Sequence, residues 1–214
     1  MKQLDQSSFP RLWTLFQKLF GDQSVKLEAA KEMISECDLI VDFGCATGFM
    51  FPLYSSTFGC SYLGLDIDEN ALAVAKENFP TATFSSANLL DFNEYLEQYS
   101  SPVIIFSNVF HHMNDPDIRK LFWVLEQLPR HVRLIALDPE AKRRSYSIVF
   151  RSFHRLEKGD FRRSITEILN LCTENGLTVT KAYEFLGRAP IWPFGPTVQA
   201  WGLEFQADAA RLSK

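Results

Sequence analysis

Short apolar runs alternate along this chain with stretches whose apolar residues recur at helical spacing. The apolar runs predict strands near residues 39–41, 60–66, 81–86, 103–106, 132–138, 177–183 and 197–201. The helical spacing predicts helices near residues 25–36, from about residue 48, and near residues 69–78, 91–100, 117–127 and 168–175. Buried strands that alternate with amphipathic helices are typical of a parallel sheet covered on both faces. The pattern therefore predicts the α/β class.

The chain shows no internal repeat and no low-complexity linker, so we expect residues 1–214 to form a single domain. Residues 1–37 are expected to form an N-terminal helical cap. Its aromatic stripe consists of Phe9, Trp13, Phe16 and Phe20. An aromatic stripe with this period is usually core, so we expect it to pack on the sheet rather than to cover a substrate.

Composition narrows the classes of function. Apolar residues make up 46% of the chain and charged residues 22%, which is ordinary for a globular domain. The net charge of −4 gives no nucleic-acid signature. The four cysteines are scattered without a Cys-x-x-Cys pair, which argues against a zinc site or a disulfide framework and favours a reducing compartment. We find no apolar run of signal-peptide or membrane-spanning length, and we expect a cytoplasmic protein.

The first strand runs directly into a loop of small residues, Asp42-Phe43-Gly44-Cys45-Ala46-Thr47-Gly48. Two glycines frame this loop, so a ligand could approach backbone N–H groups without meeting a side chain. A helix from about Gly48 would point its free N–H groups at the same place. A dinucleotide-binding loop needs Gly-x-Gly-x-x-Gly, and two of those positions fail, since they hold Ala46 and Phe49. The loop indicates either a site for a carboxylate or phosphate group, or an ordinary strand-to-helix turn.

A second feature strengthens the ligand interpretation. Asp66 ends the next apolar strand, 18 residues past Gly48. A carboxylate about 20 residues beyond such a loop is placed to accept hydrogen bonds from both hydroxyls of a ribose. Asp68 has a simpler role, as the N-cap of the helix near residues 69–78. The loop and Asp66 together indicate a nucleoside-type cofactor.

The spacing Asp42-x-Gly44-x-Ala46-x-Gly48 resembles motif I of the class I S-adenosylmethionine-dependent methyltransferases, whose commonest form has glycine where Ala46 stands. The resemblance covers roughly residues 39–201. It implies a Rossmann-like, seven-stranded, mostly parallel sheet with an antiparallel closing strand and helices on both faces. It also implies S-adenosylmethionine as the cofactor.

The resemblance assigns parts of the cofactor to parts of the chain. The methionine end would lie at Asp42 and the glycine loop, the ribose at Asp66, and the methyl-donor end near the backbone of residues 107–108. Asparagine at position 88 replaces the family's frequent aspartate, but its amide oxygen can accept the same hydrogen bond from adenine. The cofactor-binding residues expected on this basis are Asp42, Gly44, Cys45, Ala46, Gly48, Asp66, Ile67, Asn88, Leu89, Ser107 and Asn108.

Residues 107–116 resemble motif IV of small-molecule methyltransferases of the ubiquinone-biosynthesis type. The Asn-Pro-Pro-Tyr signature of enzymes that methylate planar nitrogens is absent, so we expect no nucleic-acid acceptor. His111 and His112 follow a parallel strand, at the edge where open α/β sheets bind ligands, and Asp138 ends the next strand. One histidine could take a proton from an acceptor hydroxyl. Alternatively it packs or caps the loop, and methyl transfer runs on alignment alone.

Residues 139–165 are expected to form a basic amphipathic insertion near the substrate pocket. Eight lysines and arginines but only two acids fall between Lys142 and Arg163. Such a segment can lie peripherally on an anionic membrane or hold an anionic ligand, and a solvated basic face is an equally weighted alternative. Tyr146 and His154 are the candidates for contact with the acceptor.

These features predict an S-adenosylmethionine-dependent methyltransferase that acts on a small-molecule or lipid-linked, anionic acceptor and carries no metal site. Two other classes stay open. One is a non-catalytic member that binds the cofactor and acts through a protein partner. The other is an NAD-type Rossmann oxidoreductase, which would have to tolerate the failed glycine positions. The acceptor atom and the oligomeric state do not follow from the sequence.

Overall fold

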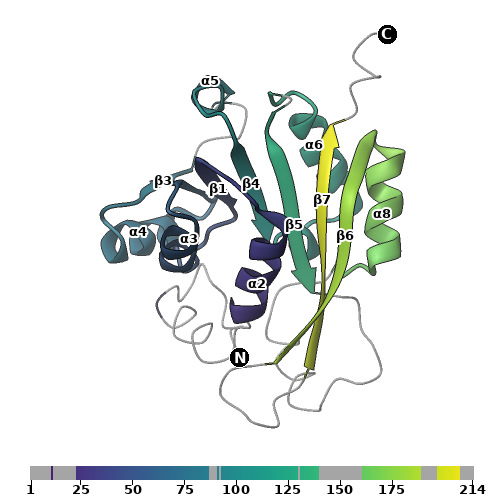
Figure 1. Cartoon of the computed structure of the whole chain (residues 1–214), viewed down its shortest axis with the longest axis horizontal. Helices are drawn as coiled ribbons and strands as arrows, with labels where there is room; N and C mark the ends of the chain where they lie inside the picture. Colours follow the sequence, from purple (N-terminus) through teal and green to yellow (C-terminus); the bar gives the residue numbers. More distant parts are fainter. Residues whose placement is uncertain are drawn as a thin grey trace.

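The computed structural model describes residues 11, 23–86, 91, 93–129, 131–139, 161–188 and 197–207. Seven strands form one sheet in the order β3-β2-β1-β4-β5-β7-β6 (Figure 1). The strands are β1 (Leu39–Phe43), β2 (Ser61–Leu65), β3 (Thr83–Ser85), β4 (Pro102–Ser107), β5 (Arg133–Pro139), β6 (Leu177–Arg188) and β7 (Thr197–Ala207). The helices are α2 (Gln23–Met33), α3 (Phe51–Phe58), α4 (Glu69–Asn78), α5 (Asn93–Leu96), the 3-10 helix η2 (Phe110–His112), α6 (Asp115–Leu125) and α8 (Ile165–Glu174).

The strand order reverses beside β1. This strand pairs in parallel with β2 on one side and with β4 on the other, so that Asp42 lies opposite both Gly64 and Ile105. From β1 the chain winds through β2 to β3, then returns to β4 and β5 on the other side. In open α/β sheets, ligands bind outside the carboxyl ends of the strands at such a reversal. These ends form the lower edge of β4 and β5 in Figure 1. The glycine loop follows β1 and the histidine pair follows β4, so both lie at this edge.

The last two strands close the sheet, and the predicted fold class is confirmed. β7 pairs antiparallel with both β5 and β6, while the strands from β3 to β5 run parallel. β6 and β7 extend well past the predicted ends at residues 183 and 201. Polar residues such as Glu184 and Glu204 interrupt the apolar runs past these ends, but backbone pairing between the two strands continues regardless of side-chain polarity.

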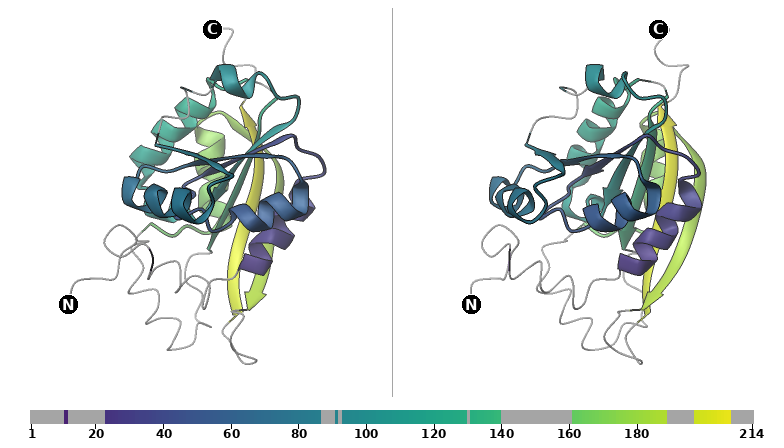
Figure 2. Two further views of the ribbon diagram at one scale, coloured as in Figure 1. Left: turned by 90° about the vertical axis from the view of Figure 1, so that its left-hand side faces the viewer. Right: turned by 60° about the vertical axis from the view of Figure 1, so that its left-hand side comes forward.

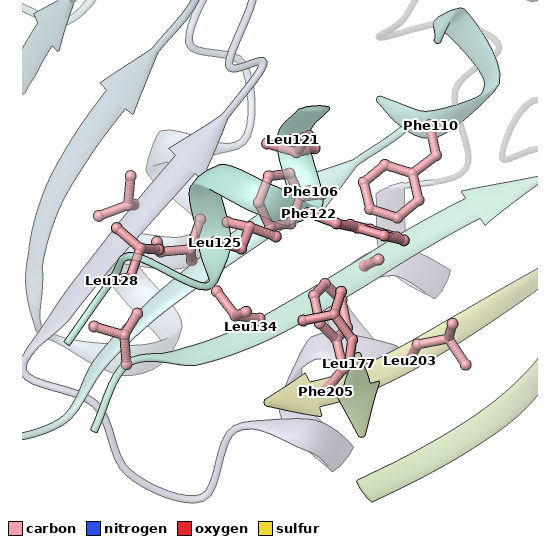
Figure 3. Packing of buried hydrophobic residues seen from close by; sticks show 14 of the residues in the cluster. Phe106, Phe110, Leu121, Phe122, Leu125, Leu128, Leu134, Leu177, Leu203 and Phe205 are labelled. Carbon is pink, nitrogen blue, oxygen red and sulfur yellow. The ribbon is translucent and has the colours of Figure 1, made fainter. Parts of the chain in front are cut away.

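Two apolar layers cover the sheet (Figure 2). Adjacent residues of β4 point into opposite layers, because side chains alternate along a strand. Ile104 and Phe106 join the layer under α6 and α8, whereas Val103 and Ile105 join the layer under α2, α3 and α4. Figure 3 shows the first layer, where Phe122 of α6 lies with its ring centroid 6.2 Å from that of Phe205 in β7. Full burial of such a side chain contributes about 1.5–3 kcal/mol.

Several helix boundaries differ from the predicted ones for local reasons. The helix after β1 begins at Phe51 rather than near Gly48, because Gly48 N–H donates to the Cys45 carbonyl and forms a turn first. α6 begins two residues early, since the Asn114 side chain caps it at Asp117 N–H. α8 begins at Ile165, behind a capping box that Ser164 and Glu167 form. The observed α5 covers four residues of the ten predicted.

Several sequence predictions lie outside the described residues. They concern the N-terminal aromatic stripe, the loop between β6 and β7, and residues 140–160 of the basic insertion. In the part of the chain that the structure describes, no helix combines the length and apolarity of a transmembrane span.

Candidate functional site

The loop after β1 turns three times through left-handed backbone. Gly44, Ala46 and Gly48 have φ angles of +79°, +53° and +71°. Glycine adopts these angles without strain, whereas alanine at φ +53° is unfavourable. The position of Ala46 is therefore one where glycine is sterically preferred, as in the commonest form of motif I. Ala46 keeps the backbone conformation that glycine would adopt there.

The N–H groups of this loop are bonded within the chain. Gly44 and Cys45 donate to the Leu65 carbonyl at 2.7 and 3.0 Å, and Ala46 donates to Asp66 Oδ2 at 2.7 Å. Gly48 donates to Cys45, as described above. These four N–H groups therefore already have acceptors within the chain, contrary to the expectation that they would bind a carboxylate or phosphate. The internal bonds instead fasten the loop to the carboxyl end of β2.

Asp66 lies beside the glycine loop, as the ribose assignment requires. Its second oxygen accepts the Asp68 N–H at 2.8 Å, so both oxygens are fixed in place. Each carboxylate oxygen keeps a further lone pair that could accept a ribose hydroxyl. Burial raises the pKa of Asp66, while the backbone bonds from Asp68 and Ala46 oppose this shift. Next to it, the Ile67 side chain is 95% exposed, an apolar surface at the rim of the site.

Asp42 is a buried carboxylate at the end of β1, only 2% exposed. The Tyr62 hydroxyl donates to its Oδ2 at 2.8 Å. Burial raises the pKa of Asp42 to about 6, and the Tyr62 hydrogen bond and the Lys26 charge only partly offset the loss of water. An ionised carboxylate that is buried away from water is unfavourable unless a positive charge lies beside it. The cationic amine of a ligand would supply such a charge at Asp42.

Two further hydroxyls lie in the same layer. Tyr54 of α3 and Ser107 at the end of β4 lie near each other, and neither shielded hydroxyl oxygen makes a hydrogen bond of normal geometry within the described residues. Buried polar groups are nearly always paired, so Tyr54 joins Ser107 as a candidate to contact a polar ligand. Sequence reasoning missed Tyr54 and Tyr62, because the apolar pattern predicts that a tyrosine lies in the core but not the position of its hydroxyl group.

The two histidines divide between core and surface. His111 is fully buried, and its Nδ1 lies 3.1 Å from Asp138 Oδ1 at the end of β5. His112 is exposed, with its ring centroid 4.1 Å from that of His111. The neighbouring Asn108 adopts φ +61° and donates its N–H to Leu137 at 2.8 Å. The structure thus brings His111 and Asp138 together at the same edge of the sheet as the glycine loop.

Arg163 does not behave as a member of a solvated basic face. It is 8% exposed, and its guanidinium donates to the carbonyls of Phe110, Met113 and Phe161 at 2.9–3.0 Å. It also pairs with Asp115 at 2.5 Å. This arginine fastens the segment before α8 to the loop that carries His111.

Four predicted site residues lie outside the described residues. They are Asn88, Leu89, Tyr146 and His154. Among the described side chains, no group of three or more histidines, cysteines and acids could hold a metal ion.

Residues 40–132 match a family model described as a methyltransferase domain. This segment begins inside β1 and ends just before β5, so it includes the glycine loop, Asp66 and both histidines. No curated protein matches the chain significantly in sequence.

Solved structures match over most of the chain. A SAM-dependent methyltransferase from Anabaena variabilis is 14% identical with a TM-score of 0.65, covering 95% of this chain and 96% of its own. A protein solved for the conversion of a disulfide bond into a thioacetal group during echinomycin biosynthesis is 21% identical, with a TM-score of 0.63 and coverage of 88% and 84%. A variant of LepI, solved with SAH and a substrate analogue, is 14% identical with a TM-score of 0.58, covering 84% of this chain and 46% of its own. Identities this low speak for the fold alone. The chain therefore has the Rossmann-like fold of these solved methyltransferase structures, and its residues 40–132 are similar to a methyltransferase domain.

Proposed function

We propose that this protein is an S-adenosylmethionine-dependent methyltransferase. The observation that carries the proposal is the hydrogen bond from Ala46 N–H to Asp66, which places the ribose-type carboxylate against the glycine loop at 2.7 Å. The match of residues 40–132 to a methyltransferase domain and the SAH held by the LepI variant support the same cofactor.

The residues around this hydrogen bond fit the polar parts of the cofactor. Asp66 would accept the ribose hydroxyls, and the exposed Ile67 would lie against the base. The buried carboxylate of Asp42, with the nearby hydroxyls of Tyr54 and Ser107, would hold the amino-acid end. When bound, S-adenosylmethionine supplies a methyl group made electrophilic by its sulfonium.

Calorimetric titration of the full chain with S-adenosylmethionine, S-adenosylhomocysteine and NAD tests the cofactor. We expect both sulfur nucleosides to bind and NAD not to bind. Asp66→Asn should weaken their binding about 10- to 100-fold, because it removes charge-assisted hydrogen bonds to hydroxyls. Asp68→Asn is the matched control, since asparagine caps a helix as well as aspartate and the affinity should stay unchanged.

Three results would contradict this assignment in whole or in part. Binding of NAD in place of the sulfur nucleosides would favour an oxidoreductase. Equal affinities of the Asp66→Asn and Asp68→Asn variants would remove Asp66 from the cofactor site. Full cofactor binding without turnover on a broad panel of phenols, amines and fatty acids would favour the non-catalytic alternative.

We further propose that His111 is the general base and that Asp138 is its positioning residue. Asp138 accepts at Nδ1, we assign proton transfer to Nε2, and the carboxylate would stabilise the imidazolium that forms. With a turned-over acceptor, His111→Gln should lower kcat about 100-fold or more without changing cofactor affinity. Asp138→Asn should shift the rising limb of the pH–rate profile to lower pH, while His112→Gln serves as the control. Loss of activity with His112→Gln alone would transfer the role to His112.

For the acceptor we propose a small or lipid-linked molecule, preferably anionic. Removing Arg163 from the basic segment leaves seven cations and two acids between residues 142 and 162. Tyr146 and His154 stay our candidates for its contact. A cytoplasmic location with peripheral membrane contact through this segment completes the proposal, and co-sedimentation with anionic but not neutral lipid vesicles would test the contact.

A further inference from the structure

Two cysteines that are distant in sequence meet at the edge of the sheet opposite the candidate site. Cys37 lies between α2 and β1, and Cys60 lies between α3 and β2; both side chains are half-buried. Their sulfur atoms are 3.1 Å apart. These two cysteines, which are far apart in the sequence, are therefore in contact in the folded protein, and both are free thiols.

The backbone holds these two positions beside each other. β1 and β2 are neighbouring parallel strands with Leu39 opposite Ser61, and the Ser61 N–H donates to the Asp38 carbonyl at 3.0 Å. The sulfur atoms need to approach by only about 1 Å to reach disulfide bonding distance. A bond between them would thus require little movement of either strand.

The two thiols are chemically unequal. The hydrogen bond from Cys37 to Cys60 lowers the pKa of Cys60 and raises that of Cys37. Since the thiolate is the nucleophile, Cys60 is the attacking sulfur and Cys37 the resolving one. The other two cysteines differ, because both are buried and burial raises the pKa of Cys45 and of Cys172, the latter to about 12.

We propose that Cys37 and Cys60 form a site of reversible oxidation that exchanges with low-molecular-weight disulfides such as oxidised glutathione. The Cys60 thiolate attacks one sulfur of the small disulfide, forms a mixed disulfide and releases one small thiolate. The Cys37 sulfur, after losing its proton to water, then attacks Cys60 Sγ and releases the second thiolate. The protein loses two electrons and two protons, and the small disulfide becomes two thiols.

The position of the cross-link defines its effect. It would close a loop from residue 37 to residue 60 that contains β1, the glycine loop and α3, and it would lie at the amino ends of the strands. A cross-link restricts the unfolded chain and so favours the folded state. Oxidation should therefore stabilise the cofactor-binding unit without entering the ligand edge. This inference does not depend on the proposed methyl transfer.

The test uses the purified full chain in glutathione redox buffers, followed by acid quenching, alkylation and mass spectrometry. We expect loss of the mass of two hydrogen atoms, a peptide that links Cys37 to Cys60, and a Tm increase of about 5–10 °C. The Cys37→Ser variant should stop at a glutathione adduct on Cys60. Cys172→Ser is the matched control and should behave as the unmodified sequence does.

Three outcomes would overturn the proposal. The first is a wild-type chain that keeps both thiols free in oxidising buffer. The second is a stable glutathione adduct in the presence of Cys37. The third is a cross-link that includes Cys45 or Cys172, because it would show oxidation of unfolded rather than folded protein.

Discussion

Ala46 and its two flanking glycines show how single residues shape the glycine loop. All three have positive φ angles, but only the alanine carries a Cβ that makes this conformation unfavourable. Its N–H nevertheless binds Asp66, so the chain retains the strained angle where it connects the loop to the ribose-type carboxylate. Strain of this size is common at functional sites.

Ala46→Gly should therefore raise the free energy of unfolding by about 0.5–1 kcal/mol, since relief of the left-handed strain exceeds the extra entropy of unfolded glycine. Urea denaturation measures this difference. Ala71→Gly in α4 is the control and should lower stability by about 1 kcal/mol, because that alanine lies in ordinary helix. A loss of stability in both variants would contradict the assigned strain at position 46.

Asp42 is subject to opposing demands of stability and binding. Its folded-state pKa of about 6 lies above the ordinary value of 3.8, so the folded protein holds this proton more tightly than the unfolded chain. The resulting stabilisation is fully present below pH 3.8 and is lost as the pH rises through 6. At neutral pH the ionised carboxylate therefore costs the fold about 2–3 kcal/mol.

Asp42→Asn should remove this cost and flatten the dependence of unfolding free energy on pH between about pH 4 and pH 7. Asparagine can still accept the Tyr62 hydrogen bond. The variant should be more stable than the wild type at about pH 7 but bind the cofactor more weakly, because it lacks the charge opposite the ligand's amine. Denaturation at several pH values and calorimetry together check both effects, and an unchanged pH slope would refute the raised pKa.

Sequence reasoning located the acidic residues of the site better than their partners. Asp42 and Asp66 follow from strand ends and spacing, and their positions at one edge follow from parallel pairing. The partner of Asp42 does not follow, since Tyr62 reaches it only through the register of β1 with β2. The same holds for Cys37 and Cys60, which are 23 residues apart and meet only because the starts of β1 and β2 lie side by side.

At the scale of elements, Arg163 connects parts of the chain that secondary-structure pairing leaves separate. It binds three carbonyls and Asp115, and so joins the segment before α8 to η2 and the start of α6. The Phe161 N–H adds a bond to the His111 carbonyl at 3.1 Å. The position of His111 therefore depends on an arginine that follows it by about fifty positions in the chain.

Arg163→Met should lower the free energy of unfolding by about 2–3 kcal/mol, mainly because buried carbonyls lose their donors. The half-exposed Asp115 partner adds little, since solvent screens that pair. Arg119→Met is the matched control, because its bridge to Glu174 is exposed and should contribute less than about 1 kcal/mol. Similar losses in both variants, measured by urea denaturation, would refute the anchoring role of Arg163.

Boundaries were predicted best for elements whose start and end are determined by neighbouring residues in the sequence. α4 begins and ends where its pattern indicates, and Asp68 caps it through the N–H groups of Asn70 and Ala71. The start of α3 and the ends of β6 and β7 were not predicted, because turns bonded to β2 and long antiparallel pairing determine them. Such boundaries depend on contacts between distant segments, which a local pattern does not contain.

At the scale of the whole molecule, the two halves of the sheet carry different candidate site residues. β1 and β2 with their loops carry Asp42 and Asp66, whereas β4 and β5 with their loops carry His111 and Asp138. These residues reach one edge of the sheet because β1 pairs with β4, so neither half of the sheet forms the candidate site alone. This dependence explains why residues with separate sequence signals converge on one edge.

The place of β7 in the sheet has a consequence for biosynthesis. β7 is the last of the seven strands to be translated, yet it lies between β5 and β6. Until β7 arrives, the nascent chain exposes an unpaired edge on β5 and cannot dock β6, and exposed edges invite pairing with other chains. A ribosome that stalls before residue 197 would therefore present an aggregation-prone sheet, and this chain should depend on chaperones most strongly at that stage of its synthesis.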